Sequence, residues 1–77
     1  MFTAILNALK AIVSKVPWYK VPQFLAWAAE FATAAAKYSL SQINTILAFI
    51  KNNPGKIVTW FLNGYSVYDI IRQILGL

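Results

Sequence analysis

Apolar residues recur every three or four positions along most of this chain, and proline, glycine or capping residues interrupt the pattern at intervals. This period is typical of helices with one buried face, whereas strands alternate at every second position. The interruptions predict helices at about residues 2–16, 22–38, 41–52, 54–63 and 66–75. The sequence therefore predicts one all-α domain, residues 1–77, folded as a compact bundle of four to five short amphipathic helices.

The predicted helix boundaries carry local signals. Pro17 and Pro22 frame the first turn, and Pro22 suits the first position of the helix that follows. Ser39 and Gln42 have the spacing of a capping box. Asn53, directly before a proline, is a predicted N-cap. Each predicted helix thus begins or ends where the residue types favour a helix end.

The composition is unusually apolar for so short a chain. Hydrophobic residues make up 60% of it, against about 45–50% in an ordinary globular domain. The longest runs without a charged residue are 38–50 and 57–68, and both are shorter than the about 20 residues of a transmembrane helix. The excess of apolar residues therefore either fills a dense core or contacts lipid without forming a single span.

The charge is strongly one-sided. Seven cations face only Glu30 and Asp69, which gives a net charge of +5. Six of the seven cations are lysines, strongly hydrated point charges that suit a diffuse anionic surface better than base readout, for which arginine is preferred. Because they are spread singly along the chain, without a recognised nucleic-acid motif, we expect an anionic lipid bilayer as the partner and no nucleic acid.

Residues for catalysis and metal binding are scarce. Without Cys or His there is no disulfide and little basis for zinc, haem or iron–sulfur chemistry. Asp69 follows Ser66 at capping-box spacing, which marks a helix start, and Glu30 is expected to be solvated or ion-paired. The glycines stand at turns and helix ends and form no phosphate-binding loop. We therefore expect no enzyme, no cofactor and no metal.

The aromatic residues point to the lipid–water interface. Three Trp and four Tyr are many for a small core, and their amphipathic rings favour that interface. Core packing is an alternative explanation, above all for Trp27 in the most apolar helix. The predicted membrane-insertion residues are Trp18, Trp27 and Trp60. The predicted adsorption residues are Lys10, Lys15, Lys20, Lys51, Lys56 and Arg72.

A stretch near the C-terminus resembles a known family. Gly55-Lys56-Ile57 is followed by Trp60 and Gly64, and aliphatic residues stand three, six, seven and ten positions after that glycine. The same spacing is found in the C-terminal half of the leaderless bacteriocins of the aureocin and lacticin Q type. The resemblance covers residues 55–76, is faint over 24–54, and does not include the predicted first helix.

The resemblance implies a saposin-like bundle and a secreted antibacterial peptide without a cleaved signal peptide. Such a peptide permeabilises the membranes of Gram-positive competitors without a protein receptor. For this chain we expect a monomer in water that can oligomerise in the membrane. Circular bacteriocins share the size, charge and lack of cysteine, so a chain joined head to tail remains an alternative to a linear one. The other class considered is a helical interaction or structural protein, such as an immunity protein or a membrane-complex subunit, that presents an apolar face to a partner. A phage-type lysis protein is disfavoured by the missing span.

Overall fold

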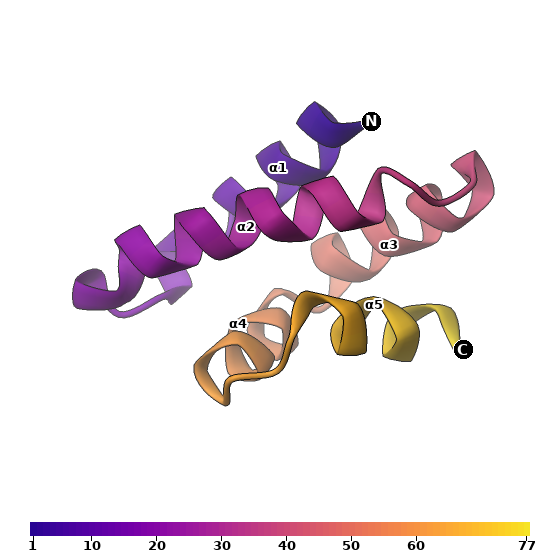
Figure 1. Ribbon diagram of the computed structural model, residues 1–77. Helices are drawn as coiled ribbons and strands as arrows, with labels where there is room; N and C mark the ends of the chain where they lie inside the picture. The colour runs from indigo at the N-terminus through magenta and orange to yellow at the C-terminus, as the bar shows by residue number, and fades with distance from the viewer.

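Five α-helices and two short 3-10 turns make up the computed structural model, which describes residues 1–77 (Figure 1). The helices are α1 (Phe2–Lys10), α2 (Val21–Ala35), α3 (Leu40–Asn52), α4 (Pro54–Leu62) and α5 (Val67–Leu75). The turns η1 (Val13–Lys15) and η2 (Trp18–Lys20) connect α1 to α2. No residue lies in a strand, so the predicted all-α bundle is confirmed.

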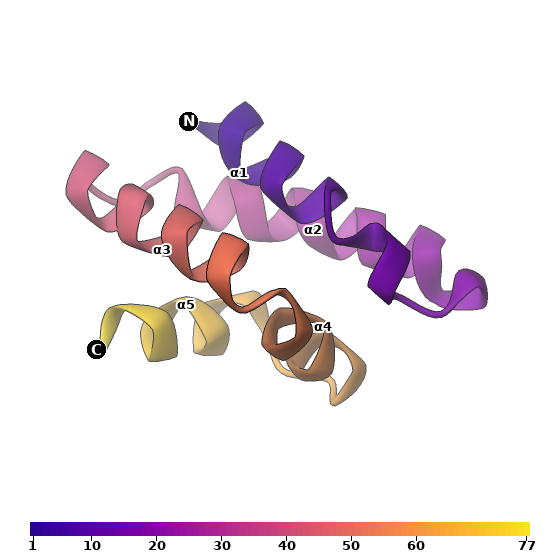
Figure 2. The same cartoon turned by 180° about the vertical axis from the view of Figure 1, so that it is seen from behind.

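Four of the helices close a ring around the core. Helix α2 packs on α1 and α5, and α3 packs on the same two helices from the opposite side (Figures 1 and 2). Helix α4 packs on α3 and lies at one end of the ring, while both termini lie at the other end. The radius of gyration of 11.2 Å agrees with the about 11.5 Å expected for a globular chain of this length.

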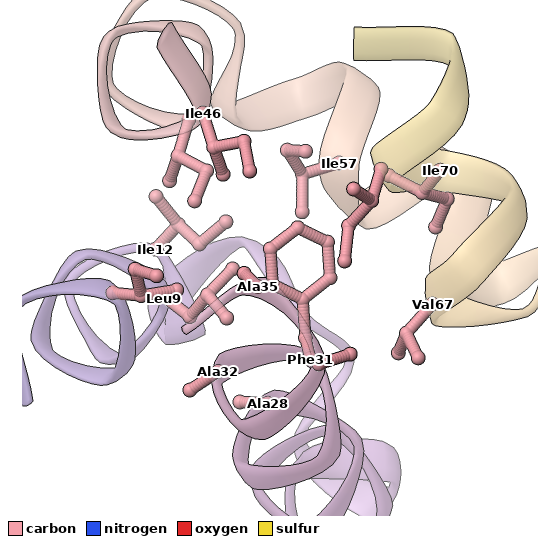
Figure 3. Packing of buried hydrophobic residues seen from close by; sticks show 14 of the residues in the cluster. Leu9, Ile12, Ala28, Phe31, Ala32, Ala35, Ile46, Ile57, Val67 and Ile70 are labelled. Carbon is pink, nitrogen blue, oxygen red and sulfur yellow. The ribbon is translucent and has the colours of Figure 1, made fainter. Parts of the chain in front are cut away.

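The core is entirely apolar. Buried side chains come from all five helices and from the segment between α1 and α2, and no polar or charged residue is among them. Phe31 of α2 projects toward Ile46, Ile57 and Ile70, which belong to three different helices (Figure 3). Because nothing directional holds these side chains together, the bundle is stabilised by burial of apolar surface and by packing.

The first helix is shorter than predicted. It was expected over residues 2–16, but α1 ends at Lys10 and the chain continues through η1. Pro17 explains part of the difference, because it forces Val16 out of the helical conformation, to φ −91° and ψ 136°. The hydrogen bonds from Ile12 N–H to the Leu9 carbonyl and from Val16 N–H to the Val13 carbonyl span three residues. The apolar period persists through these turns, so Ile12 and Val16 still reach the core.

The other helices lie close to their predicted positions. Helix α2 begins at Val21 and ends at Ala35 rather than at residue 38, because its last turn tightens, with Tyr38 N–H donating to the Ala35 carbonyl. The boundaries of α3, α4 and α5 differ from the prediction by one residue at most. These small shifts are the usual fraying of helix ends.

The predicted caps are confirmed only in part. Ser39 and Gln42 form the capping box: Gln42 N–H donates to Ser39 Oγ at 3.3 Å, and Ser39 N–H donates to Gln42 Oε1 at 3.1 Å. At α5, Asp69 N–H donates to Ser66 Oγ, without the reciprocal bond. Asn53 precedes α4, but its side chain makes no N-cap bond; its Nδ2 instead donates to the Phe49 carbonyl at the end of α3. The sequence identified the position of Asn53 but assigned its side chain to the wrong helix.

Candidate membrane-binding surface

All the predicted adsorption residues lie at the surface. Lys20 is half-buried, and the others are exposed; they are Lys10, Lys15, Lys51, Lys56 and Arg72. Lys10 is the last residue of α1, Lys15 and Lys20 end the two 3-10 turns that follow, and Lys51 and Lys56 flank the turn between α3 and α4. Arg72 stands apart on α5. The predicted adsorption residues therefore lie on α1, both 3-10 turns, α3, α4 and α5.

Lys56 belongs to an aromatic stack between α3 and α4. Its Nζ lies 5.3 Å from the centre of the Trp60 ring, one helical turn further along α4. Trp60 in turn stacks on Phe49 of α3, with ring centres 5.6 Å apart and planes inclined by only 6°. The spacing of Lys56 and Trp60 signals their contact in the sequence, but only the fold places Phe49 beneath the ring. Trp60 is half-buried, because its ring is partly covered by this packing.

Trp27 lies in a second aromatic cluster, formed by Phe24, Trp27, Phe31 and Phe61. Its ring centre is 5.6 Å from that of Phe24, 5.4 Å from that of Phe31 and 5.4 Å from that of Phe61. The three residues of α2 share a helix face, whereas Phe61 comes from α4. The cluster therefore ties α4 to α2. The sequence spacing predicts that Phe24, Trp27 and Phe31 share one face of α2, but it does not indicate that Phe61 packs against them.

The indole N–H of Trp27 is buried and has no hydrogen-bond acceptor. An unpaired buried donor costs about 1–3 kcal/mol of folding free energy. Aromatic packing of the large ring offsets this cost, because an indole removes a large apolar area from water. In water, the folded bundle thus leaves the indole N–H of Trp27 without a hydrogen bond.

Trp18 is in the opposite situation. It is 84% exposed, more than any other large hydrophobic side chain of the molecule. Its ring contacts that of Tyr19 edge-to-face, with centres 5.8 Å apart. The three predicted insertion residues therefore differ in the folded chain: Trp18 is outside, Trp60 is partly covered, and Trp27 belongs to an aromatic cluster.

The acidic residues Glu30 and Asp69 are both exposed and lie on different helices, α2 and α5. No pocket opens on the surface of the bundle. None of the helices has the length and apolar character needed to cross a bilayer. The bundle thus exposes cations and aromatic rings at its surface and buries a core of apolar side chains.

No protein family, curated protein or solved structure matches this chain. The resemblance of residues 55–76 to the leaderless bacteriocins therefore stays a prediction from the sequence.

Proposed function

We propose that this protein is an antibacterial peptide of the bacteriocin type, which binds anionic bacterial membranes and permeabilises them without a protein receptor. The observation that supports this best is the composition of the core, in which no polar or charged residue is buried. Lipid tails solvate Leu and Ile about as well as such a core does, so contacts between helices can be exchanged for contacts with lipid. The +5 charge brings the bundle to an anionic leaflet, where each cation contributes up to about 1 kcal/mol.

The unpaired indole of Trp27 supports the same exchange. In the folded bundle its N–H has no acceptor. At a lipid–water interface the same N–H meets water and ester oxygens, while the ring stays in an apolar environment. Release of the aromatic cluster at a membrane therefore removes a cost that the bundle bears in water. On the bacteriocin resemblance of residues 55–76, we extend the proposal to secretion without a cleaved signal peptide and to Gram-positive competitors as targets.

The proposal is tested by dye release from protein-free liposomes of anionic or zwitterionic lipid, at low and moderate salt. We expect rapid leakage that favours anionic lipid and weakens as salt screens the lysines. Absence of leakage at micromolar protein would contradict the proposal and favour the other class, a helical bundle that presents an apolar face to a protein partner.

The electrostatic step has its own prediction. The double substitution Lys51→Gln and Lys56→Gln removes two charges beside the α3–α4 turn and should weaken binding to anionic vesicles by up to about 30-fold, with little change on zwitterionic ones. Lys51→Arg with Lys56→Arg keeps the charge and should bind like the original protein. Vesicle co-sedimentation measures both variants. Equal losses on the two lipids would contradict the electrostatic step and assign the effect to the packing of Lys56 on Trp60.

A further inference from the structure

The segment that leads into α2 exposes two aromatic rings that the fold leaves uncovered. Trp18 is 84% and Tyr19 63% exposed, and they contact each other edge-to-face. A pair of exposed rings in contact is more informative than a single exposed apolar side chain, because contiguous apolar patches on a protein surface often mark binding sites. Pro17 and Pro22 stand on either side of the pair and restrict the backbone, so its presentation at the surface costs little conformational entropy.

The exposed pair lies at the entry to α2, whose second turn carries the exposed Leu25. The 3-10 turn Trp18–Lys20 runs directly into α2 at Val21. In both views, the start of α2 projects beyond the ends of the other helices at its end of the molecule (Figures 1 and 2). The 3-10 turn that carries the two rings therefore lies at an end of the molecule.

Lysines stand on both sides of the aromatic pair in the sequence. Lys10, Lys15 and Lys20 follow at five-residue intervals, and the first acidic residue of the chain is Glu30. An aromatic pair beside lysines matches the anionic interface of a bilayer, where rings lie at the level of the headgroups and ammonium groups meet phosphates.

We infer that Trp18 and Tyr19, with Lys15 and Lys20, form an anchor that docks the still-folded bundle on an anionic lipid surface. This inference rests on the proposed function and names the surface that makes first contact. At this step Trp27 stays in its aromatic cluster and Trp60 on Phe49, because both are held by packing that Trp18 lacks. The anchor lies in residues 15–20, outside both stretches in which the chain resembles the bacteriocins.

Single-tryptophan proteins test the order of contact. Trp27→Phe with Trp60→Phe leaves Trp18 as the only indole, and Trp18→Phe with Trp60→Phe leaves Trp27. Each is mixed rapidly with vesicles of mixed anionic and zwitterionic lipid, and indole emission and dye release are followed together. We expect the emission of Trp18 to shift to the blue before dye is released. Over the same interval its ring should become at least three-fold less accessible to acrylamide. Trp27 should change only with release. A Trp18 that stays accessible on bound vesicles, or a Trp27 that changes first, would overturn the inference.

A truncation tests the affinity that the anchor supplies. Trp18→Ala should weaken vesicle binding at least ten-fold and leave the urea unfolding midpoint unchanged, because the ring is exposed. Tyr68→Ala removes another exposed ring, on α5, and should change binding less than two-fold. If the original protein binds vesicles and releases their dye, and Trp18→Ala binds them with the same affinity, only the anchor is contradicted. If the original protein does not bind, the proposed function fails as well. Quenching of Trp18 by a single-stranded oligonucleotide, with vesicles inert, would overturn lipid docking in favour of nucleic acid.

Discussion

Small side chains determine how closely α1 approaches α2. Ala28, Ala32 and Ala35 lie on one face of α2 and are fully buried, and α1 packs on α2 more extensively than on any other helix. Figure 3 shows Ala32 on the side of α2 that faces Leu9 of α1. A methyl group at these positions lets the two backbones approach, so the core reaches a high packing density with few large side chains.

This arrangement predicts opposite outcomes for one substitution at two places in the same helix. Ala32→Leu adds three carbon atoms to a filled space and should destabilise the fold by about 1–3 kcal/mol. Ala26→Leu places the same side chain on the exposed face of α2 and should change stability by no more than about 0.5 kcal/mol. Urea denaturation followed by circular dichroism measures both. Equal losses of stability in the two variants would contradict the close packing of α1 on α2.

At the scale of the helices, local residue chemistry determines where each one ends. Gly64 follows α4 with φ +80°, and Tyr65 N–H donates to the Trp60 carbonyl, which closes the helix in a Schellman motif. Gly76 closes α5 in the same way, with φ +73°. Gly55, by contrast, lies inside the first turn of α4 in an ordinary helical conformation. The three glycines therefore do not have the same structural role.

Alanine substitutions should separate these roles. Gly64→Ala forces a Cβ into the left-handed region and should cost about 1–2 kcal/mol. Gly55→Ala should leave stability unchanged or raise it by up to about 1 kcal/mol, because alanine restricts the unfolded chain and favours the helix. Neither new Cβ meets another atom within 4 Å, so the difference reports backbone conformation alone. A loss at Gly55 as large as that at Gly64 would contradict this assignment. Thermal unfolding of the two variants decides.

For the whole molecule, the absence of polar residues from the core makes tertiary packing easier to lose than secondary structure. Helix hydrogen bonds stay within each segment, whereas the packing between helices is apolar and non-directional. On anionic vesicles we therefore expect the far-ultraviolet circular dichroism of helices to persist. The near-ultraviolet signal of the cluster Phe24, Trp27, Phe31 and Phe61 should decrease as dye is released. An unchanged near-ultraviolet signal during leakage would show that the bundle acts without opening.

The helical class and most helix boundaries were predictable because their causes are local. Pro54 and Gly64 bound α4, and the Ser39–Gln42 capping box opens α3; each acts within a few residues of itself. The early end of α1 at Lys10 was missed because the apolar period continues through the 3-10 turns that follow. A period of three or four residues does not distinguish a continuous helix from a helix followed by such turns.

For the membrane-binding residues, the sequence by itself determined a cationic, aromatic-rich helical chain, because charge and residue type do not depend on the fold. It did not determine which tryptophan meets water. That was decided by tertiary structure: Phe61 of α4 packs on Trp27, Phe49 of α3 stacks on Trp60, and Trp18 stays 84% exposed. The burial of a ring depends on residues brought to it from distant parts of the chain, and no local pattern around the ring specifies them.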